Sequence, residues 1–383
     1  MILVINSGSS SLKFKLYGRN MQPLSAGLVE RIGLKDAFLE WSVGPEKKRT
    51  DWPGGVPDHE KALAEVFRAL ELSGLPVKEI KAVGHRVVHG GEQFTAPTVV
   101  TAKVELKLAD YNRLAPLHNP ANLAGIAACR RLLPKAKPVA CFDTAFYRTL
   151  PDYAYMYALP WELYRKHQIR KYGFHGISHD YVTREAARRL KKPLSKLRLV
   201  SCHLGSGSSV TAVKFGQAVE TTMGFTPLEG LTMSTRCGDI DPAIPLYLIR
   251  ELGLTASEVD DIMNRQSGLL GISGYKDMRD VMSAAGLKVA GYRFKDKVSP
   301  EAKRRSKLAY EMFCYDVARY LASYAGLMGG CDAVIFTAGV GERNATIRKK
   351  IMSMVKLPGQ PKVLVIPTDE ELLIAQETAK AIR

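Results

Sequence analysis

Apolar positions along the chain follow two periods. Nearly continuous apolar runs at 138–146 and 332–342 predict buried strands, and helical spacing at 59–72 and 367–382 predicts helices. A third and longer helix is predicted from apolar residues spaced between 308 and 328. Strands that alternate with helices are typical of an α/β fold. In the last predicted helix, Thr368 and Glu371 have the spacing of a capping box.

The segment INSGSSSLKFKL, residues 5–16, places a small polar turn between two strand-like runs. It fits an ordinary hairpin, and it also fits a loop that cradles phosphate. A similar pattern, LVSCHLGSGSSVTAV, returns about 200 residues later, roughly one domain length. The echo favours a duplicated domain, and chance similarity between two hairpins is the alternative.

Three glycine-rich turns each follow a predicted strand, at Asn6–Ser11, Gly205–Ser209 and Gly339–Gly341. Glycine lets backbone N–H groups approach a phosphate closely, and serine adds hydroxyl donors. The patterns GxxxxGK[ST], GxGxxG, GxSxG and HExxH are all absent. The turns therefore suggest phosphate binding by a protein that is neither a P-loop enzyme nor a simple dinucleotide-binding fold.

Four charged or titratable side chains stand in segments suited to chemistry: Arg86 in GHRVVHGGE, Asp143 in CFDTAF, His175 in YGFHGISHD and Arg236 in MSTRCGDIDP. The planar guanidinium of arginine matches carboxylate and phosphate oxygens. Three of them have a simpler alternative. Arg86 fits a surface loop, Asp143 fits the N-cap of a following helix, and a lone histidine is more often structural.

Composition narrows the class of protein further. The 383 residues suggest two or three domains, and 55 Lys and Arg against 38 Asp and Glu give a net charge of +17. That excess suits anionic partners, but the basic residues are spread along the chain, which favours solvated faces over a nucleic-acid footprint. Six cysteines without a CxxC pair indicate reduced buried thiols. With no apolar run of about 18 residues and no secretory leader, we expect a soluble cytoplasmic protein.

Taken together, the motifs resemble the acetate kinase family, which includes the propionate and butyrate kinases. NSGSSSLKF, GHRVVHGGE, FDTAF, YGFHGISH, CHLGSGSS, MGFTPLEGLTMSTRCGDIDP and FTAGVGE occur in the family's order over the whole chain. The resemblance implies two duplicated domains of the actin and hexokinase (ribonuclease H-like) type, flanking a nucleotide cleft. The first, residues 1–144 plus 371–383, would serve substrate and metal. The second, residues 145–370, would bind nucleotide and dimerise.

The function implied is that of an ATP:acetate phosphotransferase. The reaction would be reversible, Mg²⁺-dependent in-line transfer from ATP to acetate, giving acetyl phosphate and ADP, with Mn²⁺ as a possible replacement. A homodimer is implied, with no nucleic-acid or membrane partner. A propionate or butyrate kinase is the alternative, and a catalytically weakened nucleotide-binding relative is a third reading.

The resemblance also assigns roles to residues. Arg86, Asp143, His175 and Arg236 would be catalytic, and Asn6 and Glu370 would hold the metal. Substrate would contact Arg86, Val88, Leu117, Phe174 and Pro227, and the branched Val88 favours acetate over propionate. Nucleotide would contact Lys13, His203, Leu204, Gly205, Ser206, Gly207, Asp277, Met278, Arg279, Gly339, Val340, Gly341, Glu342 and Arg343.

Two positions depart from the family pattern. Residue 206 is Ser and residue 343 is Arg, where the family usually has Asn at both. Arg343 would either pair with a phosphate or protrude into solvent, so both changes leave nucleotide affinity and choice open.

Overall fold

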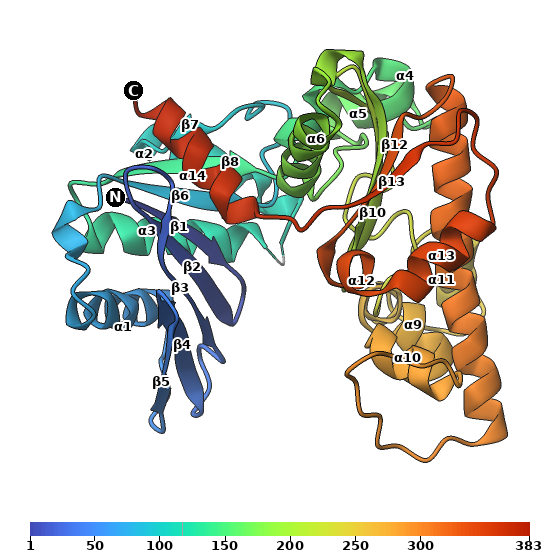
Figure 1. Cartoon of the computed structure of the whole chain (residues 1–383), viewed down its shortest axis with the longest axis horizontal. Coiled ribbons are helices and arrows are strands. Elements are labelled where there is room, and N and C mark those ends of the chain that lie inside the picture. The colour runs from blue at the N-terminus through green and yellow to red at the C-terminus, as the bar shows by residue number, and fades with distance from the viewer. Residues whose placement is uncertain (117) are drawn as a thin grey trace. The chain divides into compact units, whose positions relative to one another are not determined.

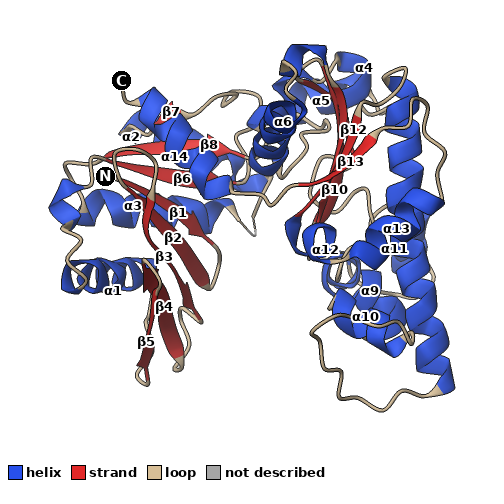
Figure 2. Ribbon diagram, in the orientation of Figure 1, coloured by secondary structure: helices blue, strands red, loops and turns tan. Residues whose placement is uncertain are grey.

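A computed structural model describes residues 1–116 and 118–383, which form two compact units (Figures 1 and 2). The first unit contains Met1–Arg148 and regains Asp369–Arg383, and the second contains Thr149–Thr368. Each unit has its own β-sheet covered by helices, which confirms the predicted α/β class.

The sheet of the first unit has the strand order β5, β4, β3, β2, β1, β6, β8, β7. β1 and β2 form the antiparallel hairpin predicted at the start of the chain, whereas β1, β6 and β8 run parallel. The strands are β1 (Ile2–Ser7), β2 (Ser11–Tyr17), β3 (Pro23–Glu30), β4 (Ala37–Val43), β5 (Glu46–Trp52), β6 (Ala82–Val87), β7 (Thr98–Val99) and β8 (Lys137–Phe142).

Alternation along these strands decides which helix each residue meets. Leu3, Ile5 and Leu12 join the core made with α1 and α3, whereas Gly84 faces α14. The C-terminal helix therefore completes the first unit by covering β1, β6 and β8. The helices and helical turns are α1 (His59–Leu72), η1 (Val77–Glu79), α2 (Ala102–Ala109), η2 (Asp110–Arg113), α3 (Asn119–Leu132), η3 (Ala145–Thr149) and α14 (Glu370–Ala381).

The sheet of the second unit has the order β11, β10, β9, β12, β13. Its strands are β9 (Arg198–Leu204), β10 (Ser208–Lys214), β11 (Gln217–Thr221), β12 (Ala333–Thr337) and β13 (Lys362–Val365). Around it lie α4 (Asp152–Tyr155), α5 (Trp161–His167), α6 (Gly176–Leu190), η4 (Leu194–Lys196), α7 (Ala243–Arg250), α8 (Ala256–Asp261), η5 (Ile262–Gln266), α9 (Gly268–Ser273), α10 (Met278–Ala284), α11 (Pro300–Leu327), α12 (Ala338–Arg343) and α13 (Ala345–Ser353).

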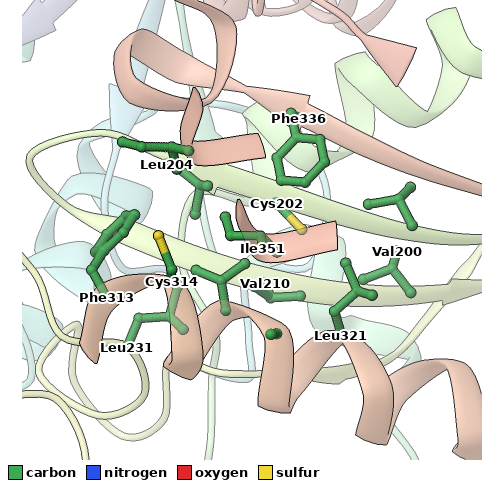
Figure 3. Packing of buried hydrophobic residues seen from close by; sticks show 14 of the residues in the cluster. Val200, Cys202, Leu204, Val210, Leu231, Phe313, Cys314, Leu321, Phe336 and Ile351 are labelled. Atoms are coloured by element: carbon green, nitrogen blue, oxygen red, sulfur yellow. The ribbon is translucent and has the colours of Figure 1, made fainter. Parts of the chain in front are cut away.

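One face of this second sheet packs against the long helix α11. Val200, Cys202 and Val210 point to that helix and meet Phe313 and Leu321 in a continuous apolar core (Figure 3). The intervening residues of β9 point to the other face, where α6 lies. That second face is polar, because Ser201 and His203 occupy it.

The two sheets share one topology. In each sheet the first strand begins a three-stranded antiparallel meander, in which it pairs with the second strand and the second pairs with the third. On its other side the first strand is followed by two parallel strands. Thus β3, β2, β1, β6, β8 correspond in order and direction to β11, β10, β9, β12, β13. The echo between the two hairpin sequences is therefore matched by the fold, as duplication predicts.

Two local predictions were wrong. Helix α14 begins at Glu370 and is capped by Asp369, whose carboxylate accepts from the backbone N–H of Leu372 at 3.0 Å, so Thr368 and Glu371 form no capping box there. Asp369 is held in place by Lys15, whose Nζ lies 3.0 Å from Asp369 Oδ1.

The second wrong prediction concerns Gly339–Gly341, which is not an open turn but part of helix α12. The Glu342 carboxylate accepts from the N–H of Ala338, the first residue of that helix.

Among the described residues, no helix combines the length and apolar character needed to cross a membrane.

The seating of α14 on the first sheet depends on Gly84. A Cβ at that position would lie 2.4 Å from Thr378 Oγ1 and 2.6 Å from Ile374 Cγ2. We expect Gly84→Val to force α14 away from the sheet and to destabilise the first unit by about 1–3 kcal/mol. Urea unfolding followed by circular dichroism measures this. Gly54→Val is the matched control, since a Cβ there meets nothing within 4 Å. Equal effects of the two substitutions would contradict the account.

Candidate active site

A buried ion pair occupies the carboxyl ends of two parallel strands in the first unit. Arg86, near the end of β6, donates from Nε to Asp143 Oδ1 at 3.1 Å and from Nη2 to Oδ2 at 2.7 Å. The Asp143 side chain is 2 % exposed and that of Arg86 is 19 % exposed. Neither simpler alternative holds. Arg86 is not a surface-loop residue, and the Asp143 carboxylate is engaged by Arg86.

The register of the sheet explains why these residues meet. β6 and β8 pair parallel, with Val87 opposite Phe142, and the N–H of Asp143 donates to the carbonyl of Val87 at 3.1 Å. In open α/β sheets, functional groups gather where parallel strands end. The sequence placed Asp143 correctly at a strand end, and of the two partners it suggested, Arg86 or a metal-bound water, Arg86 is the one that Asp143 binds here.

Glu370 adds a second carboxylate to this cluster. Its Oε2 lies 3.8 Å from Arg86 Nε. Burial and the nearby Asp143 carboxylate raise the pKa of Glu370, although the Arg86 guanidinium opposes that shift. Burial disfavours the charged form of Arg86, but the carboxylates of Asp143 and Glu370 outweigh it and raise the pKa of this arginine. The cluster thus keeps a permanent positive charge beside two acidic groups.

Asn6 and Lys13 approach the same face of the sheet. They are direct cross-strand partners in the β1–β2 hairpin, so their side chains share one face. Lys15, two residues after Lys13, points to α14 and binds Asp369 there. The hairpin, β6, the end of β8 and the start of α14 together gather Asn6, Lys13, Arg86, Asp143 and Glu370 on one face of this unit.

Residues of the expected substrate pocket are divided between the units. Val88 follows β6, is 9 % exposed, and donates its N–H to Asn122 Oδ1 at 3.1 Å. Phe174 is buried in the second unit, and the carbonyl of Pro227 accepts from Arg236 Nη1 at 3.3 Å in the same unit. Leu117 lies outside the described residues. The pocket as a whole stays a prediction.

Three histidines form a network in the second unit. His175, just before α6, stacks on His203 with ring centroids 4.2 Å apart and planes 19° apart. The Ser209 hydroxyl lies 2.9 Å from His175 Nδ1 and 2.8 Å from His179 Nε2. A hydroxyl has one proton, so Ser209 donates to one ring and accepts from the other. Burial and the neighbouring His203 keep the pKa of His179 well below its usual value, so this ring is neutral at pH 7.

The same network aims His175 and His203 at the turn between β9 and β10. Each ring is held through Nδ1 by a serine hydroxyl, Ser209 for His175 and Ser178 for His203. A Cβ at Gly207 would lie 3.4 Å from His175 Nε2 and 3.5 Å from Arg236 Nη1. These are ordinary van der Waals distances, so the backbone of the turn at Gly207 lies directly beside both His175 and Arg236.

Arg236 reaches this turn from a long loop. Its Nη1 donates to the Pro227 carbonyl at 3.3 Å and to Met233 Sδ at 3.6 Å. Within residues 1–116 and 118–383 it has no carboxylate within ion-pair distance, and burial lowers the pKa of its guanidinium. A partly buried cation with only neutral partners is suited to receive an anion.

A pocket of about 790 Å³ lies beside the turn, within the second unit. It brings together eight of the residues expected to contact nucleotide: Gly205, Ser206, Asp277, Met278, Arg279, Gly339, Val340 and Arg343. Both departures from the family pattern, Ser206 and Arg343, thus line this pocket, and both side chains are exposed in it. Because the Arg343 side chain is exposed and lines the pocket, a ligand in the pocket can reach it.

Leu204 and Glu342, which were also expected to contact nucleotide, do not line this pocket. Leu204 is fully buried in the core against α11, which leaves only its backbone for a ligand. Glu342 braces the backbone, accepting from the N–H groups of Ala338 at 2.8 Å and Thr368 at 3.1 Å. Pocket residues that the sequence did not indicate are Ser234, Thr235, Leu269, Lys276, Val289, Ala290, Gly291, Tyr292, Phe313 and Asn344. Arg279, which the sequence indicated, contacts Tyr292, which it did not: the guanidinium carbon of Arg279 lies 4.8 Å from the centroid of the Tyr292 ring.

The fold and the two clusters define a class: a duplicated α/β kinase, with an arginine–carboxylate cluster in one unit and, in the other, a histidine network and a pocket lined in part by Arg279 and Arg343. The chain belongs to the acetokinase family, whose model matches residues 1–361. The prediction of an enzyme of this family is confirmed.

Similar proteins span the whole chain. An acetate kinase of Clostridium novyi is 48% identical, covering 100% of this chain and 98% of its own, and one of Methanosarcina thermophila is 46% identical, covering 100% and 97%. Among solved structures, an acetate kinase of Porphyromonas gingivalis gives a TM-score of 0.88 at 37% identity, covering 100% and 99%. A propionate kinase of Francisella tularensis gives 0.89 at 39% identity, covering 99% of each chain.

Beside Arg86, the buried His85 makes stability sensitive to acid. Its ring nitrogens have no hydrogen-bond partner among the described residues, and burial, with a smaller effect of Arg130, lowers its pKa to about 3. Between about pH 6.5 and 3 the unfolded chain binds a proton that the folded chain does not, so stability falls as the pH falls. The loss for this residue is up to about 1.4 kcal/mol per pH unit.

We therefore expect His85→Leu to flatten the dependence of unfolding free energy on pH in this window, measured by urea titrations at several pH values. His167→Leu, at the exposed end of α5, serves as the control and should leave the slope unchanged. An unchanged slope in His85→Leu would show that His85 is protonated at its ordinary pH in the folded protein.

Proposed function

We propose that this chain catalyses reversible transfer of the γ-phosphoryl group of ATP to acetate, giving acetyl phosphate and ADP. The observation that carries the proposal is the 46–48% identity, over the whole chain, to relatives named acetate kinase. A carboxylate oxygen of acetate attacks the γ-phosphorus in line, a new O–P bond forms, and the bond to the β-phosphate oxygen breaks. Acetate has no proton to lose at pH 7, so no general base is needed.

On the first unit, Arg86 binds the acetate carboxylate through its guanidinium. Asp143 positions Arg86 by holding its Nε and Nη2, at 3.1 and 2.7 Å. Because the side chain of Asp143 is almost fully buried and both oxygens are engaged by Arg86, it acts through that residue. Val88, Phe174, Pro227 and Leu117 surround the methyl group of acetate in this proposal.

On the second unit, His175 and Arg236 stabilise the charge of the transferring phosphoryl group. The pocket of about 790 Å³ receives the nucleotide, with Gly205–Gly207 toward its phosphates and Asp277–Arg279 toward its adenosine. Lys13 neutralises phosphate charge. The free guanidinium of Arg236, which has only neutral partners among the described residues, supports this role.

Asn6 and Glu370 fit a Mg²⁺ ion, because amide and carboxylate oxygens are the donors that this hard cation prefers. Among the described residues no group of three or more His, Cys, Asp or Glu is arranged to hold a metal by itself. We propose that Asn6 and Glu370 hold the ion together with nucleotide phosphates and water, and that Mn²⁺ can replace it. When bound, the metal neutralises charge on the phosphates.

We further propose a homodimer located in the cytoplasm. All six cysteines are free thiols, and five of them are buried, as suits a reducing compartment.

The direct test is a hydroxamate assay for acetyl phosphate with ATP, acetate and Mg²⁺. We expect product with the wild-type chain and a loss of at least about 100-fold with Arg236→Ala, because the developing charge loses its cation. No product from the folded wild-type chain would overturn the proposal, and would favour a nucleotide-binding relative without turnover.

A propionate kinase is the second candidate, favoured by the similarity to the solved propionate kinase. Running the same assay with acetate, propionate and butyrate separates the two. One methylene changes transition-state binding by only about 1–3 kcal/mol, so propionate should be a poorer substrate and not an excluded one. A higher kcat/KM for propionate than for acetate would reverse the assignment.

Asp143→Asn tests the positioning of Arg86. The amide keeps the shape and one acceptor oxygen but removes the charge that holds the guanidinium, so we expect kcat to fall by at least about 100-fold, with a much smaller change in the KM for acetate. Steady-state kinetics with both substrates varied measure this. Wild-type kinetics in the folded variant would exclude the role.

A further inference from the structure

Residues 285–299 connect α10 to α11 and contain neither helix nor strand (Figure 1). Four successive residues of this α10–α11 connection, 289–292, line the pocket of about 790 Å³ in the second unit. The nucleotide contacts proposed for that pocket are made by Gly205–Gly207 and Asp277–Arg279. The connection is therefore an additional wall of the same site, contributed by a different part of the chain.

Aromatic and apolar side chains anchor the α10–α11 connection. The Tyr292 hydroxyl donates to Asp280 Oδ1, on α10, at 2.5 Å. Phe294 meets Tyr275 edge to face, with ring centroids 5.7 Å apart. Leu287 packs against the apolar core around α11. These contacts hold the backbone of the connection beside the pocket, so the side chains between the anchors have defined places at its edge.

The side chains between the anchors are cationic. Lys288, Arg293, Lys295 and Lys297 are exposed, and none of them has an ion-pair partner among the described residues. From residue 288 to residue 307 the chain has eight Lys or Arg and two Asp or Glu, a far stronger excess than the 55 and 38 of the whole chain. Since Lys288 and Arg293 directly flank residues 289–292, their charges border the pocket wall.

The lining of the pocket has the same sign of charge. Lys276, Arg279 and Arg343 line it together with one acidic residue, Asp277. Asp277 is engaged by Arg279, whose Nη2 lies 2.6 Å from Oδ2. Lys276 and Arg343 have no carboxylate partner in the part of the chain that the structure describes. Clefts lined by one sign of charge concentrate ligands of the opposite sign, so this pocket suits a ligand with several negative charges.

We propose that the α10–α11 connection is a cationic wall that attracts the nucleotide by charge and raises the affinity of the pocket for ADP and ATP over AMP. The inference rests on the nucleotide site proposed above and adds to it an element outside the glycine turn. A pocket of about 790 Å³ bordered by these cations favours a small polyanion over nucleic acid. Part of the net charge of +17 thereby acquires a function.

Isothermal titration calorimetry of the full chain with ADP, ATP and AMP, in the absence of acetate, tests the proposal. The triple variant Lys288→Glu, Arg293→Glu, Lys295→Glu should weaken ADP binding at least about tenfold at about 0.01 M salt. At about 1 M salt the loss should be less than about twofold, because the Debye length falls from about 30 Å to about 3 Å. At low salt the loss should be larger for ATP than for AMP, which carries fewer charges.

The matched control is the triple variant Lys192→Glu, Lys196→Glu, Lys362→Glu, which lowers the net charge by the same amount. Lys192 and Lys196 precede β9 and Lys362 begins β13, and all three side chains are exposed. They lie at the amino ends of the parallel strands β9, β12 and β13, whereas the pocket residues Gly205 and Gly339 follow the carboxyl ends of β9 and β12. The control should bind ADP within about twofold of the wild-type chain. Circular dichroism establishes that each variant is folded.

Tyr292→Phe tests the anchor separately. It keeps the ring but removes the hydroxyl from Asp280, so ADP binding should weaken about threefold or more, by an amount that does not vary with salt. Wild-type affinity in this variant would overturn the anchoring role.

Equal losses in the two triple variants, or a loss that persists at high salt, would overturn attraction by charge. A wild-type chain that binds no ADP would overturn both this inference and the proposed reaction. Salt-dependent ADP binding through the connection, without acetyl phosphate in the hydroxamate assay, would support the inference and overturn the reaction alone. Acetyl phosphate formation together with ADP binding that is insensitive to these charges would overturn the inference alone.

Discussion

The first unit depends on the pairing of Arg86 with Asp143. A guanidinium held below the surface is stable only if a carboxylate compensates for the lost water, and here both oxygens of Asp143 do so. The pairing in turn requires β6 and β8 to run parallel in the observed register, because only then do both residues reach one strand end. Helix α14 returns from the far end of the chain and places a second acidic group, Glu370, 3.8 Å from Arg86 Nε.

Arg236 of the second unit differs from Arg86 in having no carboxylate partner among the described residues. Arg236 is partly buried and bound only by neutral groups, a carbonyl and a thioether. In the first unit the arginine's charge is matched before any ligand binds, which fixes its orientation, whereas in the second the charge stays open to an anion. Phosphoryl transfer depends mainly on positioning and on charge stabilisation, so these two devices suit the two sides of the proposed reaction. The histidines beside Arg236 are held rigidly by serine hydroxyls, which places His175 without adding a competing negative charge.

Local patterns predicted much of this arrangement. Alternation in the two hairpins fixes which residues face which helix, so the positions of Asn6, Lys13 and Ser201 follow from the strand period alone. What local patterns missed depends on contacts distant in sequence. Asp369 takes the helix cap while Lys15, far away in the chain, binds it. The helical turn at 339–341 is the exception, because there Glu342 accepts from the nearby N–H of Ala338. The pocket wall at 289–292 carries no recognisable motif, and only its contact with Arg279 brings Tyr292 into the site.

The central claim is that Asp143 serves the reaction through Arg86, and a double-mutant cycle measures this most directly. The values of kcat/KM for acetate would be compared in Arg86→Ala, Asp143→Ala and the double variant, each shown to be folded. If Asp143 acts only by holding Arg86, its removal costs nothing further once Arg86 is gone, so the double variant should match Arg86→Ala. Losses that multiply, so that the double variant is far worse than either single variant, would contradict the account and give Asp143 a role of its own.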